Sequence, residues 1–169
     1  AKEGLRRPLE FLKVAMKGVP SGICWLVVPS YTVSPPSPLL MAPVTVRFNG
    51  TAEAPIVISG PATGPRPVLM GRSSHNTIRL ANSSHVVIRR LEVNGRRLGG
   101  FGVSAQGPAH HITIDDNVCY GLDSDQQVVA ISTTGSATWN WIIRRNHISN
   151  AGTGMYLGNS DGTSPFVAG

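Results

Sequence analysis

The stretch "ITIDDNVC", residues 112–119, decides the fold because its pattern occurs three times in the chain. "VVIRRLEV" begins at Val86 and "WIIRRNHI" at Trp141, so the copies are offset by 26 and then 29 residues. Apolar residues recur at the first, third and eighth positions, and Leu or Asn holds the sixth. A turn and a second short strand pattern follow each copy. Such a repeat without a helix is typical of a solenoid, in which neighbouring coils bury each other's apolar faces.

The repeat predicts an all-β chain whose coils stack in parallel. Parallel strands normally need helical crossovers, and no helix pattern lies between these segments. A chain that runs round the circumference of a coil satisfies parallel pairing without them, so we predict a parallel β-helix of about four coils. The alternative is a β-sandwich, which would show hairpins with tight turns and would not keep eight positions in phase.

The region before the repeats has a different pattern. Residues 6–18 read as a short amphipathic helix, because Pro8 suits the first turn, Gly18 suits the end and apolar residues recur at helical spacing. The apolar run "ICWLVV" predicts a buried strand, and a proline-rich connector follows it up to Pro43. We therefore divide the chain into an N-terminal segment, residues 1–45, and coils, residues 46–169.

Charge and composition narrow the range of partners. The formal net charge is +6, which favours acidic partners such as an anionic polysaccharide. The basic residues are scattered and no nucleic-acid-binding motif occurs, so nucleic acid is not expected as a partner. No apolar stretch is long enough to span a membrane, and residues 1–11 lack a signal-peptide pattern.

Two further motifs carry a resemblance to a known family. "NGTAEAPIVISG", residues 49–60, is similar to a G-T-x-x-x-P-I-x-I segment, and "SGICWLVVPSY" gives the order glycine turn, strand, Pro-x-Tyr. With Asn117 and Asn146 at one inward position of the repeat, the chain resembles the pectate-lyase-like superfamily along nearly its whole length. The resemblance implies a right-handed parallel β-helix with an N-terminal capping helix. It also implies further coils after Gly169 and an extracellular or periplasmic location.

The resemblance also implies a function. The expected protein acts on or binds an acidic polysaccharide, as a polysaccharide lyase or hydrolase; the alternative is a non-catalytic glycan-binding or surface-scaffold β-helix. Members of the superfamily bind saccharide along an outer sheet groove edged by loops. The candidate groove residues here are Arg96, Arg97, Asp123, Asp125 and Tyr156.

Two points about this groove stay open. We align Tyr156 with Ala130 on the second strand of the coil, where its ring would face outward. Asp123 and Asp125 could join a Ca²⁺ site, as in lyases of the superfamily, but an Arg–Asp ion pair between adjacent loops is the interpretation we favour. The catalytic residues stay unassigned, because the chain shows no complete catalytic set.

The residues around the opening stretch have the types used in catalysis, but the repeat favours structural roles. It places each of two aspartates between two arginines of neighbouring coils: Asp115 between Arg89 and Arg144, and Asp116 between Arg90 and Arg145. Ladders of alternating charge stabilise a sheet surface. A flanking arginine lowers the pKa of an aspartate, which makes it a poor general acid. We therefore prefer paired ladders to a catalytic dyad.

The histidines and the cysteine are interpreted in the same way. His85, His111 and Asn140 share one position, which favours a hydrogen-bonding turn residue over a metal ligand. His147 lacks the partners that a metal site would need. Cys119 is expected in the core and not in a disulfide with Cys24, which is 95 residues away. The inward Asn117 and Asn146 are expected to hydrogen-bond to each other.

Overall fold

The structure is a computed structural model, and it describes residues 24–27, 39–41, 44–73, 75–133 and 135–158. The predicted capping helix and most of the proline-rich connector lie outside the described residues. Within these ranges, every regular element is a β-strand.

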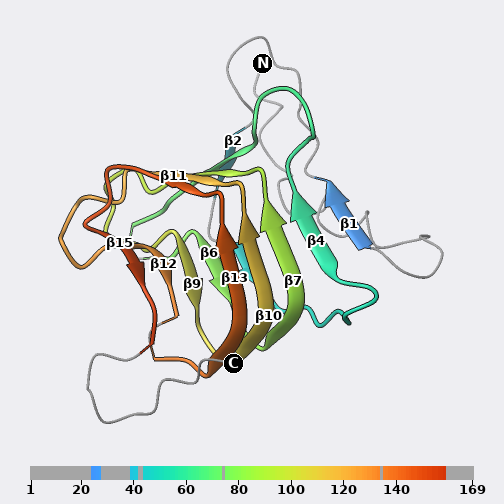
Figure 1. The fold of residues 1–169 in the computed structure, drawn as a ribbon. Helices are drawn as coiled ribbons and strands as arrows, with labels where there is room; N and C mark the ends of the chain where they lie inside the picture. Colours follow the sequence, from blue (N-terminus) through green and yellow to red (C-terminus); the bar gives the residue numbers. More distant parts are fainter. Residues whose placement is uncertain (1–23, 28–38, 42–43, 74, 134, 159–169) are drawn as a thin grey trace, which may run out of the picture.

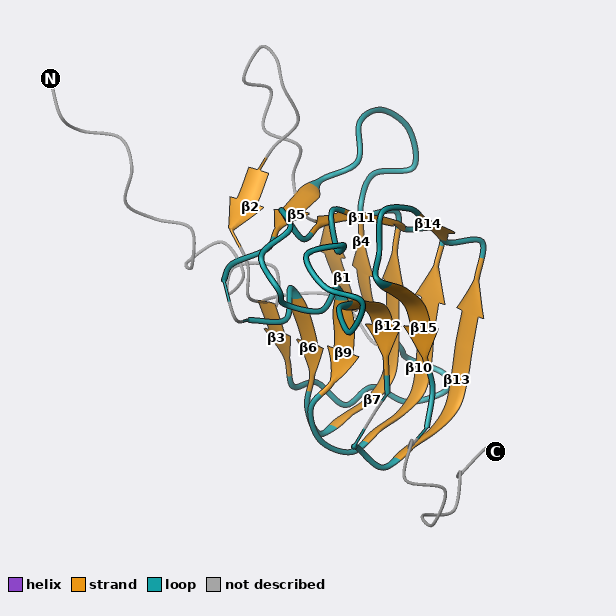
Figure 2. Ribbon diagram, turned by 90° about the vertical axis from the view of Figure 1, so that its left-hand side faces the viewer, coloured by secondary structure: helices purple, strands orange, loops and turns teal. Residues whose placement is uncertain are grey.

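The strands form three parallel sheets that make the three faces of a solenoid (Figures 1 and 2). Sheet A contains, in spatial order, β1 (Cys24–Val27), β4 (Ile56–Ser59), β7 (Ser83–Arg89), β10 (Ala109–Asp115) and β13 (Thr138–Arg144). Sheet B contains β14 (His147–Ile148), β11 (Val118–Tyr120), β8 (Glu92–Asn94), β5 (Val68–Met70) and β2 (Leu39–Met41). Sheet C contains β15 (Thr153–Tyr156), β12 (Val129–Ser132), β9 (Val103–Ala105), β6 (Ile78–Leu80) and β3 (Val44–Val46). The chain visits A, B and C in turn and makes four complete turns between β1 and β13, which confirms the predicted parallel solenoid of about four coils.

The register of sheet A is the one that the repeat predicts. Ile112 pairs with Val86 on one side and Trp141 on the other, and Ile114 pairs with Ile88 in the same way. The inward side chains of these positions are fully buried in the central coils. The core is thus a set of columns of like side chains, which neighbouring coils bury for one another.

Two columns of residues with positive φ mark the bends of the coil. His85, His111 and Asn140 have φ of 51°, 53° and 54° within β7, β10 and β13. Arg90, Asp116 and Arg145 have φ of 54°, 53° and 55° at the corner between sheets A and B. The left-handed conformation costs about 1 kcal/mol or more for a residue with a side chain, and Asn, Asp and His tolerate it best. The repeat therefore includes backbone geometry as well as apolar spacing.

Asparagines form a short ladder inside the corner between sheets A and B, as predicted. The Asn117 side chain donates to the carbonyl of Ile88 at 3.0 Å and accepts from the backbone N–H of Leu91 at 3.1 Å. Its amide also donates to Asn146 Oδ1, and Asn146 donates to the carbonyl of Ile114. These bonds satisfy backbone groups that the bend removes from the sheet ladders.

The two aspartates differ in how far they follow the predicted ladders. Asp115 lies in register between Arg89 and Arg144, as predicted, and its carboxylate is buried. Arg145 binds it through two nitrogens at 2.9 and 2.6 Å, and Arg144 adds a contact at 3.3 Å.

The predicted placement of Asp116 between Arg90 and Arg145 is wrong for the side chains. Asp116 instead pairs with Arg66 at 2.8 Å, and Arg66 also donates to its carbonyl. Arg90 turns to Ser59 and Gly60 of the preceding coil. The backbones keep the column, because the Arg90 N–H donates to the Asp116 carbonyl, but the side chains bind partners elsewhere.

The last coil corrects a second alignment. Tyr156 pairs with Ser132 and not with Ala130. It therefore continues the column of Ser104 and Ser132 into the next coil. Met155 and Leu157 are two residues apart, and a period of two fits either register. Both are about half exposed, as is Ile142 of the same coil.

We predict that Asn117→Ala lowers the free energy of unfolding by about 3 kcal/mol, because it leaves a buried N–H and a buried carbonyl without partners. Asn146→Ala is the matched control. It also removes the partners of the Asn117 N–H and the Ile114 carbonyl, but Asn146 is partly exposed and water can take its place, so the loss should be about 1 kcal/mol. Urea unfolding followed by circular dichroism measures both. Equal losses in the two variants would contradict the proposed role of the buried ladder.

A second prediction concerns pH. The hydrogen bonds from Arg145, and then those from Arg144, hold the pKa of Asp115 below its ordinary value against the opposing effect of burial. The ionised pair therefore stabilises the fold above about pH 4, and this contribution is lost as the pH falls through the lowered pKa. We expect Asp115→Asn to cost about 1 kcal/mol at pH 7, a modest figure because both arginines are more than half exposed. The difference in free energy of unfolding between Asp115→Asn and the wild type should become smaller in acid. At neutral pH, the same substitution of Asp115 should cost less when it is made in the Arg145→Gln variant.

Candidate functional site

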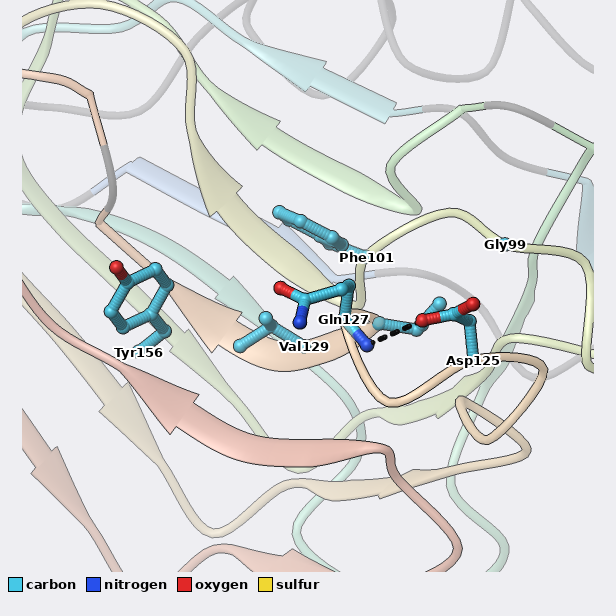
Figure 3. Close-up of a pocket in the computed structure, with 7 residues that line it drawn as sticks. Gly99, Phe101, Asp125, Gln127, Val129 and Tyr156 are labelled. Carbon is cyan, nitrogen blue, oxygen red and sulfur yellow. Dashed lines mark hydrogen bonds between the residues drawn. The ribbon is translucent and has the colours of Figure 1, made fainter. Parts of the chain in front are cut away.

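Two successive loops that lead from sheet B to sheet C border a groove on the outside of the solenoid. The loops cover residues 95–102 and 121–128, and the groove has a volume of about 330 Å³. This lies at the low end of the range for small-molecule sites. Its lining residues are Gly99, Phe101, Asp125, Gln127, Val128, Val129 and Tyr156. Figure 3 shows Tyr156 at one end and Asp125 at the other, with Phe101, Gln127 and Val129 between them.

The second loop is held by its own hydrogen bonds. Asp125 Oδ1 accepts the backbone N–H of Gln127 at 2.8 Å (Figure 3), and the Asp125 carbonyl accepts that of Val128 at 3.1 Å. The next coil adds Thr153, which donates its hydroxyl to the carbonyl of Gln126. The carboxylate of Asp125 is thus fixed in orientation although the residue is exposed.

The first loop is held by a close approach to the coil before it. A Cβ on Gly100 would lie 2.0 Å from the carbonyl oxygen of His75, so this position requires glycine. The next backbone N–H, that of Phe101, binds Asn76 Oδ1 at 3.1 Å. These contacts fix the Phe101 ring at the edge of the groove.

The arginines of the first loop stand beside the groove. Arg96 and Arg97 both have positive φ, and both side chains are exposed. Arg97 Nε lies 3.1 Å from Asp123 Oδ1 across the two loops. That oxygen has no directional hydrogen bond, so the contact is a loose ion pair. The arginine is exposed and the aspartate part-buried, and a pair of this kind near the surface contributes about 0–1 kcal/mol.

The structure brings the residues predicted from the sequence into one region, but in two groups. Asp125 and Tyr156 line the groove, whereas Arg97 and Asp123 form the ion pair between the loops and Arg96 lies beside them. Sequence reasoning missed Phe101 and Gln127. Neither belongs to a repeat column, and the chain offers no periodic signal for loop residues.

The outer face of sheet C is closed in the middle. Ser104 and Ser132 occupy its outward column, yet they are only 2% and 1% exposed. Ser104 accepts a hydrogen bond from the Gln106 side chain. Any ligand must therefore be bound at the loops and at Tyr156 and not along the middle of this face.

Among the described residues, few further candidate ligands for Ca²⁺ lie near the carboxylates of Asp123 and Asp125. In the described ranges, neither Asp123 nor Asp125 belongs to a group of three or more candidate metal ligands. Calcium usually takes six to eight oxygen ligands. The geometry therefore gives no support to a Ca²⁺ site formed by this pair.

Histidines gather at a different place, on the bend where the chain enters sheet A. Nitrogens of His85, His110 and His111 all lie within 4.8 Å of one another. His110 Nδ1 and His111 Nδ1 are 2.8 Å apart. The rings of His85 and His111 stack with centroids 4.4 Å apart, while His110 stands nearly perpendicular to both.

The next coil orients this cluster. The ring of Trp139 stacks on His110 at 4.2 Å, and the side-chain amide of Asn140 lies 2.9 Å from His111 Nε2. Desolvation, and then the neighbouring His111 and His85, lower the pKa of His110, which favours its neutral form. Nearby, the pKa of the exposed Glu53 is lowered by hydrogen bonds from its own backbone and from Thr51, with a smaller effect of His85.

Comparisons with family models, curated proteins and solved structures find no significant match for this chain. Among the described residues, no helix is long and apolar enough to cross a membrane.

Cys119 does not contribute to either site. It is a buried, free thiol with no exposed surface, and burial raises its pKa to about 12.

We predict that in Cys24→Ser, which retains Cys119 as its one cysteine, a thiol reagent at pH 8 reacts only as fast as the protein unfolds. Reaction should be immediate in concentrated urea. Rapid labelling of the native protein would show that the thiol is accessible.

Proposed function

We propose that this chain binds an acidic polysaccharide in the groove between the two loops and Tyr156. The observation that carries the proposal is the composition of the groove. Aromatic rings of Phe101 and Tyr156 adjoin the polar groups of Asp125 and Gln127. Sugars present apolar C–H faces and a rim of hydroxyls, so they suit a site that offers rings together with fixed hydrogen-bonding groups.

The preference for an acidic chain comes from the arginines beside the groove. Arg96 makes no ion pair with any residue in the described ranges, and the Arg97 side chain is 70% exposed. Guanidinium groups bind carboxylates through paired hydrogen bonds. A uronate polymer would place hydroxyls against Asp125 and carboxylates against the arginines. The net charge of +6 would assist its approach.

We propose binding and not cleavage by this chain. A hydrolase of the usual kind needs two carboxylates flanking the scissile bond. Of the described residues that line the groove, Asp125 is the one with a carboxylate, and Asp123 nearby is paired with Arg97. The likeness to pectate-lyase-like proteins keeps a lyase or hydrolase as the second candidate, and the test below includes it.

The test is affinity electrophoresis and calorimetry with polygalacturonate, alginate and chondroitin sulfate, and with neutral dextran as the control polymer. We expect saturable binding to at least one acidic polymer, weakened by salt, and none to dextran. Tyr156→Ala should weaken binding about tenfold or more, since stacked aromatic anchors carry a large share of binding energy. Tyr120→Ala, which truncates a half-buried tyrosine on sheet B, is the matched control and should bind as the wild type.

The polar groups are tested separately. Asp125→Ala should weaken binding at every salt concentration, whereas Arg97→Ala should chiefly reduce the salt dependence. If neither Tyr156→Ala nor Asp125→Ala weakens binding, the groove is not the binding site. Appearance of unsaturated sugar, followed by ultraviolet absorbance, would overturn the proposal of binding alone and favour a lyase.

A further inference from the structure

The histidine cluster carries an inference that is independent of the groove, because it lies at a different corner of the coil. We propose that His85, His110 and His111 together bind one divalent transition-metal ion, with Zn²⁺ as the expected ion. Neutral imidazole is a preferred ligand of Zn²⁺, Cu²⁺ and Ni²⁺, and three imidazoles with an open fourth position form a known type of zinc site.

The spacing of the solenoid brings the ligands together. His85 and His111 occupy equivalent positions of adjacent coils, so their rings stack at 4.4 Å. His110 would point away from His111 in a regular strand, but the left-handed conformation of His111 breaks the alternation and brings the two Nδ1 atoms to 2.8 Å.

The distances suit coordination after small side-chain rotations. Tetrahedral zinc with Zn–N bonds of about 2.0–2.1 Å holds its nitrogens roughly 3.3 Å apart. The candidate nitrogens lie within 4.8 Å of one another, with the closest pair at 2.8 Å. The set thus straddles the required spacing, and the stacked rings of His85 and His111 must tilt so that both nitrogens point at one ion.

Neighbouring residues supply the contacts that usually orient metal-bound histidines. A ligating histidine generally donates its other ring N–H to an oxygen. In the structure the Asn140 side-chain nitrogen Nδ2 lies 2.9 Å from His111 Nε2 and donates to it. If Nδ1 of His111 holds the metal and Nε2 carries a proton, a half-turn of this amide presents its oxygen to Nε2 as the acceptor. Trp139 stacks on His110 and limits the rotation of that ring.

The backbone by itself does not require histidine at these positions. The equivalent position of the next coil is Asn140, which adopts the same left-handed conformation without being a histidine. The position of His110 is held by Ser84 in the coil before and Trp139 in the coil after. Three imidazoles in contact are therefore an addition to the repeat and not a consequence of it.

The cluster is also open enough for an ion to enter. His111 is exposed, and His85 and His110 are partly buried. The exposed carboxylate of Glu53 lies close enough to His85 for the histidine to affect its pKa. A bound ion would have its fourth position toward solvent, available to water or to an oxygen of a ligand.

The test is calorimetric titration of the chelator-treated full chain with ZnCl₂. We expect one ion per chain. His85→Asn and His111→Asn keep a residue that tolerates the left-handed bend, so both should fold normally and weaken zinc binding about tenfold or more each. His110→Gln should do the same. His75→Asn and His147→Asn, which remove histidines outside the cluster, are the matched controls and should bind as the wild type.

A second readout locates the ion. In NMR spectra, zinc should shift the imidazole resonances of the three cluster histidines and leave those of His75 and His147 in place. Circular dichroism and thermal unfolding without metal establish that each variant is folded. The proposal fails if folded wild type shows no saturable one-to-one binding. It also fails if the cluster variants bind as the wild type, or if the His147 variant weakens binding as much as they do.

Discussion

Parallel pairing of each coil with the next, in one fixed register, is the constraint on which the rest of the structure depends. Strands stacked this way lie about 4.8 Å apart, so a side chain at one position contacts its equivalents above and below. A slip of one residue would turn every core side chain outward. The register therefore builds columns: the aliphatic core, the Asn117–Asn146 ladder and the stacked His85 and His111 are outcomes of one geometric rule.

The corners make that register possible and decide where variation can occur. The corner between sheets A and B has the same two-residue length in the last three coils, residues 90–91, 116–117 and 145–146, and its first residue is left-handed each time. The connections from sheet B to sheet C vary more: they cover residues 71–77, 95–102, 121–128 and 149–152. Loops on a rigid scaffold are free to vary, and the groove with Phe101 and Tyr156 lies against the two eight-residue loops, next to the shorter connection 149–152.

The sequence predicted the parts of the molecule that repeat in phase. The register of sheet A was predicted from the alignment of Val86, Ile112 and Trp141. The Asn117 ladder was predicted from the sixth position of the repeat. It failed where a residue leaves its column. Arg66 reaches Asp116 from a loop between β4 and β5, which no periodicity describes. Tyr156 was misaligned because Met155 and Leu157 both fit a period of two. For the groove, the charged residues and Tyr156 could be proposed, but Phe101 and Gln127 depend on how two irregular loops meet.

The histidine cluster shows why local backbone conformation, more than composition, limits such predictions. Strand alternation places His110 and His111 on opposite faces, and on that rule the chain supplies only the stacked pair. The left-handed conformation of His111 interrupts this alternation and brings His110 to the same side as the stacked pair. The third ligand therefore depends on a backbone dihedral angle that the amino-acid sequence does not show directly. The same bend accepts Asn at position 140, which closes the cluster on that side with an amide instead of a further imidazole. The two coils that carry His85 and His110–His111 therefore define the whole extent of the proposed metal site.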